Sequence, residues 1–234
     1  MRLVVASRKL HKWLMLFIGF QFVIWTISGA YMVIFDIDYI HGDSLVLNQQ
    51  TRLNAKALNY SIAQLYQDHP QAKNIELATW IDKEVYRFEA EGKRFLISAK
   101  NGKQLSPLTQ AQAIKMAQYV YAGQGKVESA KLLTDHAPVE LNPRFLPAWR
   151  IDFDDSENTS LYVSAETGKL VTKRHQYWRL FDWMFSFHVM DYVDEEVDNK
   201  LLLWFTILAL FAAFSGAILT YYSFFKNADK EVTE

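Results

Sequence analysis

The chain has 234 residues, of which 50% are hydrophobic and 22% are charged, and its net charge is −1. This composition is close to that of an average soluble domain, and the nearly neutral charge lacks the basic footprint of a nucleic-acid-binding protein. The chain contains no cysteine, which excludes disulfides, iron–sulfur clusters, thiolate metal sites and covalently attached c-type haem.

Two charge-free apolar runs lie near the ends of the chain, at residues 13–35 and 201–225. Each is longer than the roughly 20 residues that a helix needs to cross a bilayer, so we predict a transmembrane helix in each. A cleaved signal peptide is the alternative for the first run, because Ser28-Gly29-Ala30 offers small residues for cleavage. Signal peptides, however, have an apolar stretch of only about 7–15 residues, and this run is longer.

Charged residues beside the two runs predict the orientation in the membrane. The residues at their outer ends are basic: Arg2, Arg8, Lys9, Lys12, Lys226 and Lys230. The residues at their inner ends are acidic: Asp36, Asp38, Asp43, Asp191, Asp194, Glu195, Glu196 and Asp198. Because positive residues concentrate on the cytoplasmic side, we expect residues 1–12 and 226–234 in the cytoplasm and residues 36–200 outside. For a bacterial inner membrane, the outside is the periplasm.

Small residues in the second run predict that the two helices pack on each other. They follow four-residue spacings: Ala209, Ala213 and Ala217 in one row, and Ala212 and Gly216 in another. Such spacing lets helix backbones approach closely in lipid. By depth, Gly19 of the first run is expected to face Gly216. The alternatives are that these small residues face another copy of the chain or only lipid.

The segment between the runs contains an internal repeat. The first copy reads Tyr86-Arg87-Phe88-Glu89, Phe95-Leu96-Ile97-Ser98-Ala99 and Asn101-Gly102-Lys103, and the second reads Trp149-Arg150-Ile151-Asp152, Leu161-Tyr162-Val163-Ser164-Ala165 and Thr167-Gly168-Lys169. Each copy predicts a β-hairpin, and helical spacing of apolar residues predicts a helix before each, at 55–67 and 110–121. A unit this small is marginal alone, so the units at 36–108 and 109–174 are expected to share a buried face.

This repeat resembles the PepSY domain, above all from Pro147 to Leu170. The segments Arg8–Trp13 and Arg179–Trp183, which precede the two runs, complete a resemblance to the PepSY-associated transmembrane family. The resemblance implies an α+β fold in which a two-helix transmembrane hairpin brackets a tandem PepSY-like module. PepSY domains act as inhibitors or folding aids in propeptides of thermolysin-type metallopeptidases. They also occur in inner-membrane siderophore-iron reductases that hold haem b between transmembrane helices, although those reductases have more helices than one hairpin.

Two histidines match the family's pattern and are the candidate cofactor-binding residues, His11 and His188. Haem b needs an axial nitrogen on each face of the iron, or one face open to a substrate. About 30 Å of hydrocarbon would separate the two residues. A haem held by His11 and His188 therefore requires a homodimer or another membrane protein as partner. The competing interpretation is that both histidines make interfacial or headgroup contacts without a cofactor.

The segment 175–200 is expected to lie in the membrane interface. If it is helical, one face carries an aromatic stripe: Trp178, Phe181, Phe185, His188 and Tyr192. Such a stripe is typical of an interfacial anchor. His41, near the same leaflet, is a candidate axial partner for His188. The remaining histidines are expected at the surface: His69, His136 and His175.

Standard catalytic motifs are absent from the sequence, including the zinc-protease, nucleophile-elbow, phosphate-loop and dinucleotide-binding patterns. The Gly123-Gln124-Gly125 turn has no apolar helix after it. The nearby acidic residues Asp152, Asp154 and Asp155 are interpreted as a solvated turn. The chain is therefore not expected to be catalytic alone; at most it is part of a haem b-dependent reductase.

Two functions remain open for this membrane-embedded chain. The first is an inner-membrane accessory protein that supports iron-, siderophore- or haem-linked transmembrane electron transfer with a partner. The second is a non-redox binding or peptidase-inhibitor-like module, tethered to the membrane, that meets a periplasmic protein or peptidase. Exposed hairpin edges would be the natural peptide-binding surface of that module.

Overall fold

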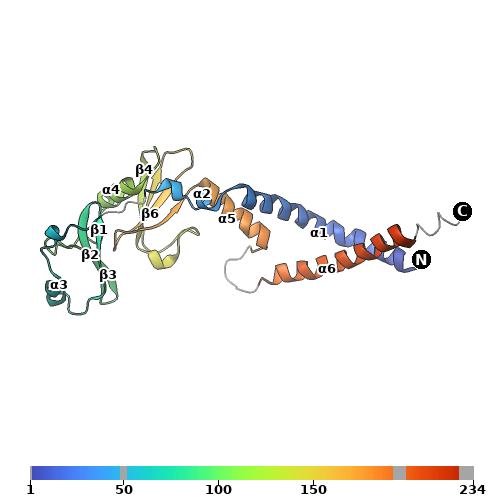
Figure 1. Ribbon diagram of the computed structural model, residues 1–234, viewed down its shortest axis with the longest axis horizontal. Helices are drawn as coiled ribbons and strands as arrows, with labels where there is room; N and C mark the ends of the chain where they lie inside the picture. Colours follow the sequence, from blue (N-terminus) through green and yellow to red (C-terminus); the bar gives the residue numbers. More distant parts are fainter. Residues whose placement is uncertain (1, 48–51, 192–198, 227–234) are drawn as a thin grey trace. The chain divides into compact units, whose positions relative to one another are not determined.

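The computed structural model describes residues 2–47, 52–191 and 199–226, which divide into two compact units (Figure 1). One unit is helical and combines residues up to Asp36 with residues from Leu180 onward. The other, Ile37–Arg179, is the α+β module between the two apolar runs. The acidic residues at 194–198, Lys230 and Tyr192 of the predicted stripe lie outside the described residues.

The helical unit is built from two long helices that pack against each other, α1 (Arg2–Ile34) and α6 (Lys200–Tyr221). A short π-helical turn, Tyr222–Lys226, continues α6. A third helix, α5 (Gln176–Val189), ends in the same unit. The parts Val5–Ile34 and Lys200–Phe225 are long and apolar enough to cross a membrane, and they cover both predicted spans except Phe35.

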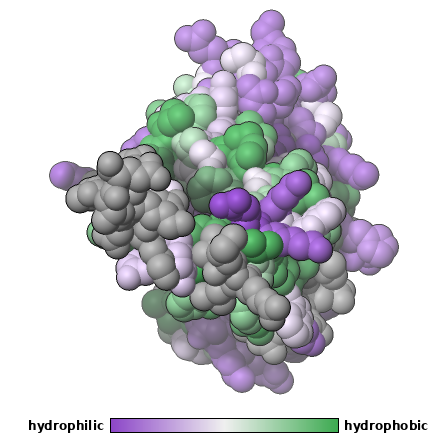
Figure 2. All heavy atoms as spheres, turned by 90° about the vertical axis from the view of Figure 1, so that its right-hand side faces the viewer, coloured by the Kyte–Doolittle hydropathy of each residue, from purple (hydrophilic) through white to green (hydrophobic). Residues whose placement is uncertain are grey.

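Polar side chains of α1 lie inside the helical unit, whereas large apolar side chains lie outside. Ser7, Gln21 and Ser28 are buried, whereas Phe17 and Phe20 are more than two-thirds exposed. Figure 2, seen from the side of the chain ends, shows hydrophobic surface next to hydrophilic groups. This arrangement suits a lipid environment, where apolar surface needs no cover and polar groups need partners.

The packing of α1 on α6 confirms the prediction that the two runs associate, with one correction. Of the two rows of small residues, the row with Ala212 is used: Ala212 is buried, and Gly216 faces α1, whereas Ala213 and Ala217 are exposed. Gly19 does not face Gly216, because the imidazole of His11 fills the space opposite Gly216.

Two antiparallel sheets form the module. The first has the order β1 (Lys73–Trp80), β2 (Lys83–Ala90) and β3 (Lys93–Ser98). The second has the order β4 (Val127–Leu133), β5 (Ala148–Phe153), β6 (Ser160–Ser164) and β7 (Leu170–Arg174). The predicted hairpins are confirmed as β2–β3 and β5–β6. The exposed hairpin edges that were expected are mostly covered: β1 pairs with the outer edge of β2, β4 with that of β5 and β7 with that of β6. Among the described strands, only β3 of the two hairpins is at the edge of its sheet.

A helix precedes each sheet, and both helices begin in the same way. A capping box starts α3 (Ile62–Asp68) at Ser61 and α4 (Gln110–Val120) at Thr109. The first helix is shorter than the predicted 55–67, because residues Ala55–Ala57 form a separate 3-10 turn. The chain before the first helix contains two further short elements, α2 (Ile37–Ile40) and a 3-10 turn at Asp43–Leu45.

The two copies of the repeat share one hydrophobic core, as expected. It joins Trp80 and Leu96 of the first sheet to Ile151 and Leu161 of the second, with Ala113 of α4 between them. The turn of the second copy that contains Gly168 packs directly on the indole ring of Trp80. The two copies therefore share part of their core, and the first copy has a second cluster of its own around Tyr86, Phe88 and Ile97.

One long insertion distinguishes the copies. Ile81-Asp82 joins β1 to β2, whereas residues 134–147, which include a 3-10 turn at Pro143–Phe145, join β4 to β5. Glu140 of this insertion accepts two hydrogen bonds from Arg179, at 2.7 and 3.1 Å, and another from Tyr162. Burial favours a higher pKa for Glu140, but these hydrogen bonds outweigh burial and hold the pKa below its usual value. The insertion thus binds the first turn of α5 to the second sheet.

Candidate functional site

His11 lies on α1 and faces α6. Its Nδ1 atom is 3.0 Å from the carbonyl oxygen of Ala212 and 3.1 Å from Ser215 Oγ. The Ser215 hydroxyl donates to the same carbonyl at 2.9 Å, and a carbonyl oxygen can only accept. We therefore assign the imidazole proton to Nδ1, which leaves the lone pair on Nε2.

His188 repeats this arrangement near the C-terminus of α5. Its Nδ1 atom lies 2.9 Å from Ser28 Oγ. The Ser28 hydroxyl donates to the carbonyl of Ile24 at 2.8 Å, so its oxygen is left to accept from Nδ1. Again the lone pair falls on Nε2. Among the residues that the structure describes, no hydrogen bond engages Nε2 of either histidine.

A glycine follows each serine, and it lets the imidazole approach the helix. A Cβ on Gly216 would lie 3.0 Å from Cε1 of His11, and a Cβ on Gly29 would lie 3.4 Å from Cε1 of His188. Each histidine therefore lies against a Ser-Gly pair on another helix, and we call these the two Ser-Gly contacts. The sequence analysis missed them, although the same dipeptide occurring once in each apolar run was a usable signal.

Three side chains hold the end of α5 that carries His188. Gln21 Nε2 donates to the carbonyl of Phe187 at 3.4 Å, and Trp25 Nε1 donates to the carbonyl of His188 at 2.7 Å. Asn199, which caps α6, donates to the carbonyl of Val189. The last carbonyls of a helix have no partner within it, so these donors both satisfy the helix end and fix the position of His188.

The two Ser-Gly contacts lie far apart along the helices. His11 and Ser28 are 17 positions apart on α1, which at 1.5 Å per residue is about 25 Å. The structure therefore brings each histidine to a helix of its own chain but does not bring His11 and His188 together.

The other histidines belong to the module. The ring of His41 contacts that of Trp178 in a tilted arrangement, with ring centroids 4.9 Å apart and an interplanar angle of 39°. His175 was expected at the surface, but this prediction is wrong because its side chain is 0% exposed. Its Nε2 atom is 2.9 Å from the carbonyl of Ile40, and its Nδ1 atom is 3.2 Å from Glu157 Oε2. The carbonyl of Ile40 accepts from Nε2 and replaces one contact with water, whereas Nδ1 and Glu157 Oε2 are buried without a hydrogen-bond partner among the described residues.

A histidine with its Nδ1 hydrogen donated and its Nε2 free is the arrangement that suits an axial ligand of haem. Metal-binding histidines almost always donate their second ring nitrogen to a neighbouring acceptor, which fixes the tautomer and the ring orientation. His11 and His188 are both half-buried and meet this condition. Each of the two rings could supply one axial nitrogen to haem b. Among the described residues of the helical unit, however, neither ring has a second histidine beside it.

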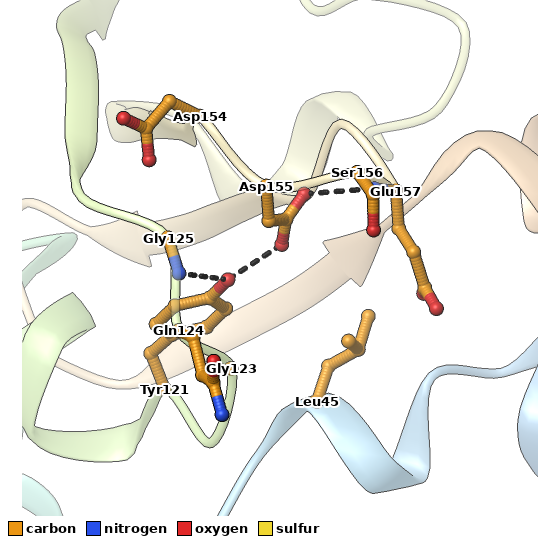
Figure 3. Close-up of a pocket in the computed structure, with 9 residues that line it drawn as sticks. All are labelled: Leu45, Tyr121, Gly123, Gln124, Gly125, Asp154, Asp155, Ser156 and Glu157. Atoms are coloured by element: carbon orange, nitrogen blue, oxygen red, sulfur yellow. Dashed lines mark hydrogen bonds between the residues drawn. The ribbon is translucent and has the colours of Figure 1, made fainter.

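The module contains a pocket of about 400 Å³ between the Gly123–Gly125 turn and the turn at 154–157 (Figure 3). Tyr121 donates to Asp155 at 2.5 Å and accepts from the amide of Gly125 at 3.2 Å. Burial, followed by the bond to Asp155, raises the pKa of Tyr121 to about 12. The acidic turn is thus not simply solvated, since Asp155 also accepts from the amides of Glu157 and Thr159.

The fold and these contacts define the protein as a membrane protein with an α+β module between two membrane-spanning helices. Comparison with protein families matches the family described as PepSY-associated TM region over residues 8–232. The comparison with curated proteins gives no match, and neither does the comparison with solved structures. Because the match covers almost the whole chain, the protein belongs to the PepSY-associated transmembrane family.

Proposed function

We propose that this protein is an accessory subunit of transmembrane electron transfer in a bacterial inner membrane, serving iron- or haem-linked partners. In this proposal His11 and His188 are axial ligands of haem b, and the module between the helices is periplasmic. The observation that carries the proposal is the pair of Ser-Gly contacts. Each contact fixes a half-buried histidine of the helical unit with Nε2 free. His11 lies in a candidate membrane span, where an ionisable residue is a functional candidate by default.

The side chains have separable roles in this proposal. Ser28 and Ser215 orient the rings by accepting from Nδ1, and the backbone carbonyl of Ala212 adds a second acceptor for His11. Trp25 holds the helix end that carries His188. Haem, when bound, supplies one-electron transfer. The basic residues in the N-terminal part of α1 and the acidic residues after it support the orientation with both termini in the cytoplasm.

A visible spectrum of the full-length protein in mild detergent tests the proposal. We expect a Soret band that weakens in His11→Ala and in His188→Ala. The matched control is His136→Ala, because His136 is an exposed residue of the module. Wild-type protein that stays colourless after titration with haem would refute the proposal.

The non-redox alternative draws its support from the pocket at Tyr121 and Asp155 (Figure 3). A pocket of this size, with an apolar side chain such as Leu45 beside polar groups, suits a small ligand or one side chain of a peptide. If the protein is colourless, this alternative predicts that a periplasmic partner is captured by the wild type. Capture should be lost when Gln124→Trp, at an exposed residue that lines the pocket, obstructs it, and kept in the control His136→Ala.

A further inference from the structure

Two buried polar atoms of the module face each other without a hydrogen bond. His175 Nδ1 and Glu157 Oε2 lie 3.2 Å apart, and the side chain of His175 is 0% exposed. Neither atom has a hydrogen-bond partner among the described residues. Buried polar atoms normally have a partner, so each exception calls for an explanation. At this distance, a hydrogen between the two atoms would complete the contact.

The other ring nitrogen of His175 shows that this hydrogen must be an additional one. Nε2 lies 2.9 Å from the carbonyl oxygen of Ile40, and a carbonyl oxygen can only accept. A neutral imidazole carries one N–H, and the bond to Ile40 uses it. Nδ1 then presents a lone pair to Oε2 of Glu157, and an ionised carboxylate presents only lone pairs in return. One further proton on either atom turns this repulsion into a hydrogen bond.

The groups packed around the pair leave Glu157 as the counter-charge of the ring. Tyr39 of α2 donates to Glu157 Oε1 at 3.1 Å, and the ring of Tyr177 in α5 lies 5.9 Å from that of His175 between centroids. Both are phenols, which are neutral near pH 7. The charged and titratable side chains on the neighbouring elements contact other partners: Lys173 and Asp43 each other, Arg174 and His41 the ring of Trp178, Arg179 Glu140, Asp154 the amide of Lys126, and Asp155 Tyr121.

We propose that His175 and Glu157 together hold one proton at neutral pH, and that this pair is a pH-sensitive switch between the pocket and the start of α5. Glu157 is one of the residues that line the pocket (Figure 3). Its turn is joined to α5 by Gln176, whose amide donates to the carbonyl of Glu157 at 2.8 Å and whose side chain donates to that of Ser156 at 3.1 Å. Loss of the proton leaves a carboxylate against a lone pair in a buried place. Glu157 then moves toward the pocket and water, and the turn separates from α5.

Proton linkage gives the direction of the pH dependence. An unperturbed histidine has a pKa of about 6.5, so above that pH the open state holds no proton at this site, whereas the closed pair still holds one. The equilibrium constant for opening should therefore rise about tenfold per pH unit above about pH 6.5, until the closed pair itself loses its proton. Between about pH 5 and 6.5 both states hold one proton, and the opening constant should be flat.

The variant Glu157→Gln should remove this dependence. Its amide oxygen can keep the bond from Tyr39, while its amide nitrogen takes the place of Oε2 and donates to Nδ1 of a neutral ring. The closed state of the variant holds no additional proton, so its opening constant should be flat above about pH 6.5 and rise as the pH falls below that value. The matched control, Glu128→Gln, removes a carboxylate from an exposed position of β4 and should keep the wild-type dependence.

Hydrogen exchange of the full-length protein in detergent, followed by mass spectrometry from pH 5 to 8.5 and corrected for the intrinsic exchange rate, measures opening in peptides that contain Gln176. We expect the ratio of the opening constants of wild type and Glu157→Gln to rise about tenfold per pH unit. The same pH dependence in both proteins, or a flat wild-type curve above pH 6.5, would overturn the inference. An equal dependence in peptides of β2 would mean that the whole module opens, and would overturn a local switch. Since every hydrogen bond of the pair is kept in Glu157→Gln, failure of this variant to fold at pH 8 would also count against the shared proton.

Discussion

Replacing Gly168 with alanine should push the two sheets of the module slightly apart and lower the stability of the module. Gly168 has a φ of +64°, and a Cβ there would lie 2.6 Å from Trp80 Nε1 and 3.0 Å from a methyl of Leu96. Forcing an L-residue into this backbone region costs about 1–2 kcal/mol. Favourable contacts need about 3.5–4.0 Å, so the shared core must open by roughly 1 Å, and overpacking of this kind costs about 1–3 kcal/mol.

The matched control is Gly92→Ala. Gly92 has a φ of +74°, but no atom lies within 4 Å of the added Cβ, so only the backbone cost applies. The difference between the two variants should be about 1–3 kcal/mol, which for a domain of this size corresponds to a Tm difference of about 2–12 °C. Thermal unfolding of the full-length protein in detergent, followed by near-ultraviolet circular dichroism, measures it. Equal Tm values for the two variants would refute the shared core at Trp80.

Three further predictions concern the membrane helices, the insertion and the pocket. Gly216→Ala should push His11 off its hydrogen bond and destabilise the helix pair by about 1 kcal/mol in SDS titration, whereas Gly19→Ala, with open space beside it, should not; equal midpoints would contradict this. Because the pKa of Glu140 is lowered in the folded state, its contribution is present above about pH 4–5 and lost as the pH falls further. Glu140→Gln should therefore lower the Tm at pH 7 and flatten its acid dependence, and parallel curves would argue against the ion pair. Tyr121→Phe removes the donor at 2.5 Å from Asp155 and should cost about 1–2 kcal/mol while raising the pKa of Asp155 in a carboxyl-carbon NMR titration; an unchanged pKa would exclude that bond.

The membrane spans and the central hairpins were predictable because their signals are local. Length and absence of charge define a span, and the repeated aromatic-Arg-apolar-acid pattern marks β2 and β5. The flanking strands β1, β4 and β7 were missed. Both β1 and β4 are at a sheet edge, and Trp80 is the one fully buried residue in the two strands. Tertiary pairing, not the local pattern, makes them strands.

The candidate site was predictable only in part, because its contacts join residues that lie far apart in the sequence. His11 and His188 were identified by resemblance, but their partners lie 201 and 160 positions away along the chain. His175 was misplaced because its burial depends on Ile40 and Glu157, which only the folded module brings to it. Sequence patterns report the period of an element and its caps, and they carry little information about which distant carbonyl satisfies a given ring nitrogen.

Because of the insertion at 134–147, a force on α5 would act differently on the two copies of the repeat. Glu140 accepts two charge-assisted hydrogen bonds from Arg179. Such a bidentate pair fixes both the position and the orientation of the first turn of α5, on which Arg179 lies. Tension applied along α5 would load the second sheet first. The first sheet would receive that force through the core that it shares at Trp80 and Ile151 and through the hydrogen bonds of Arg87 and Arg94 to the second copy. The second copy therefore receives a force on α5 directly, through Glu140.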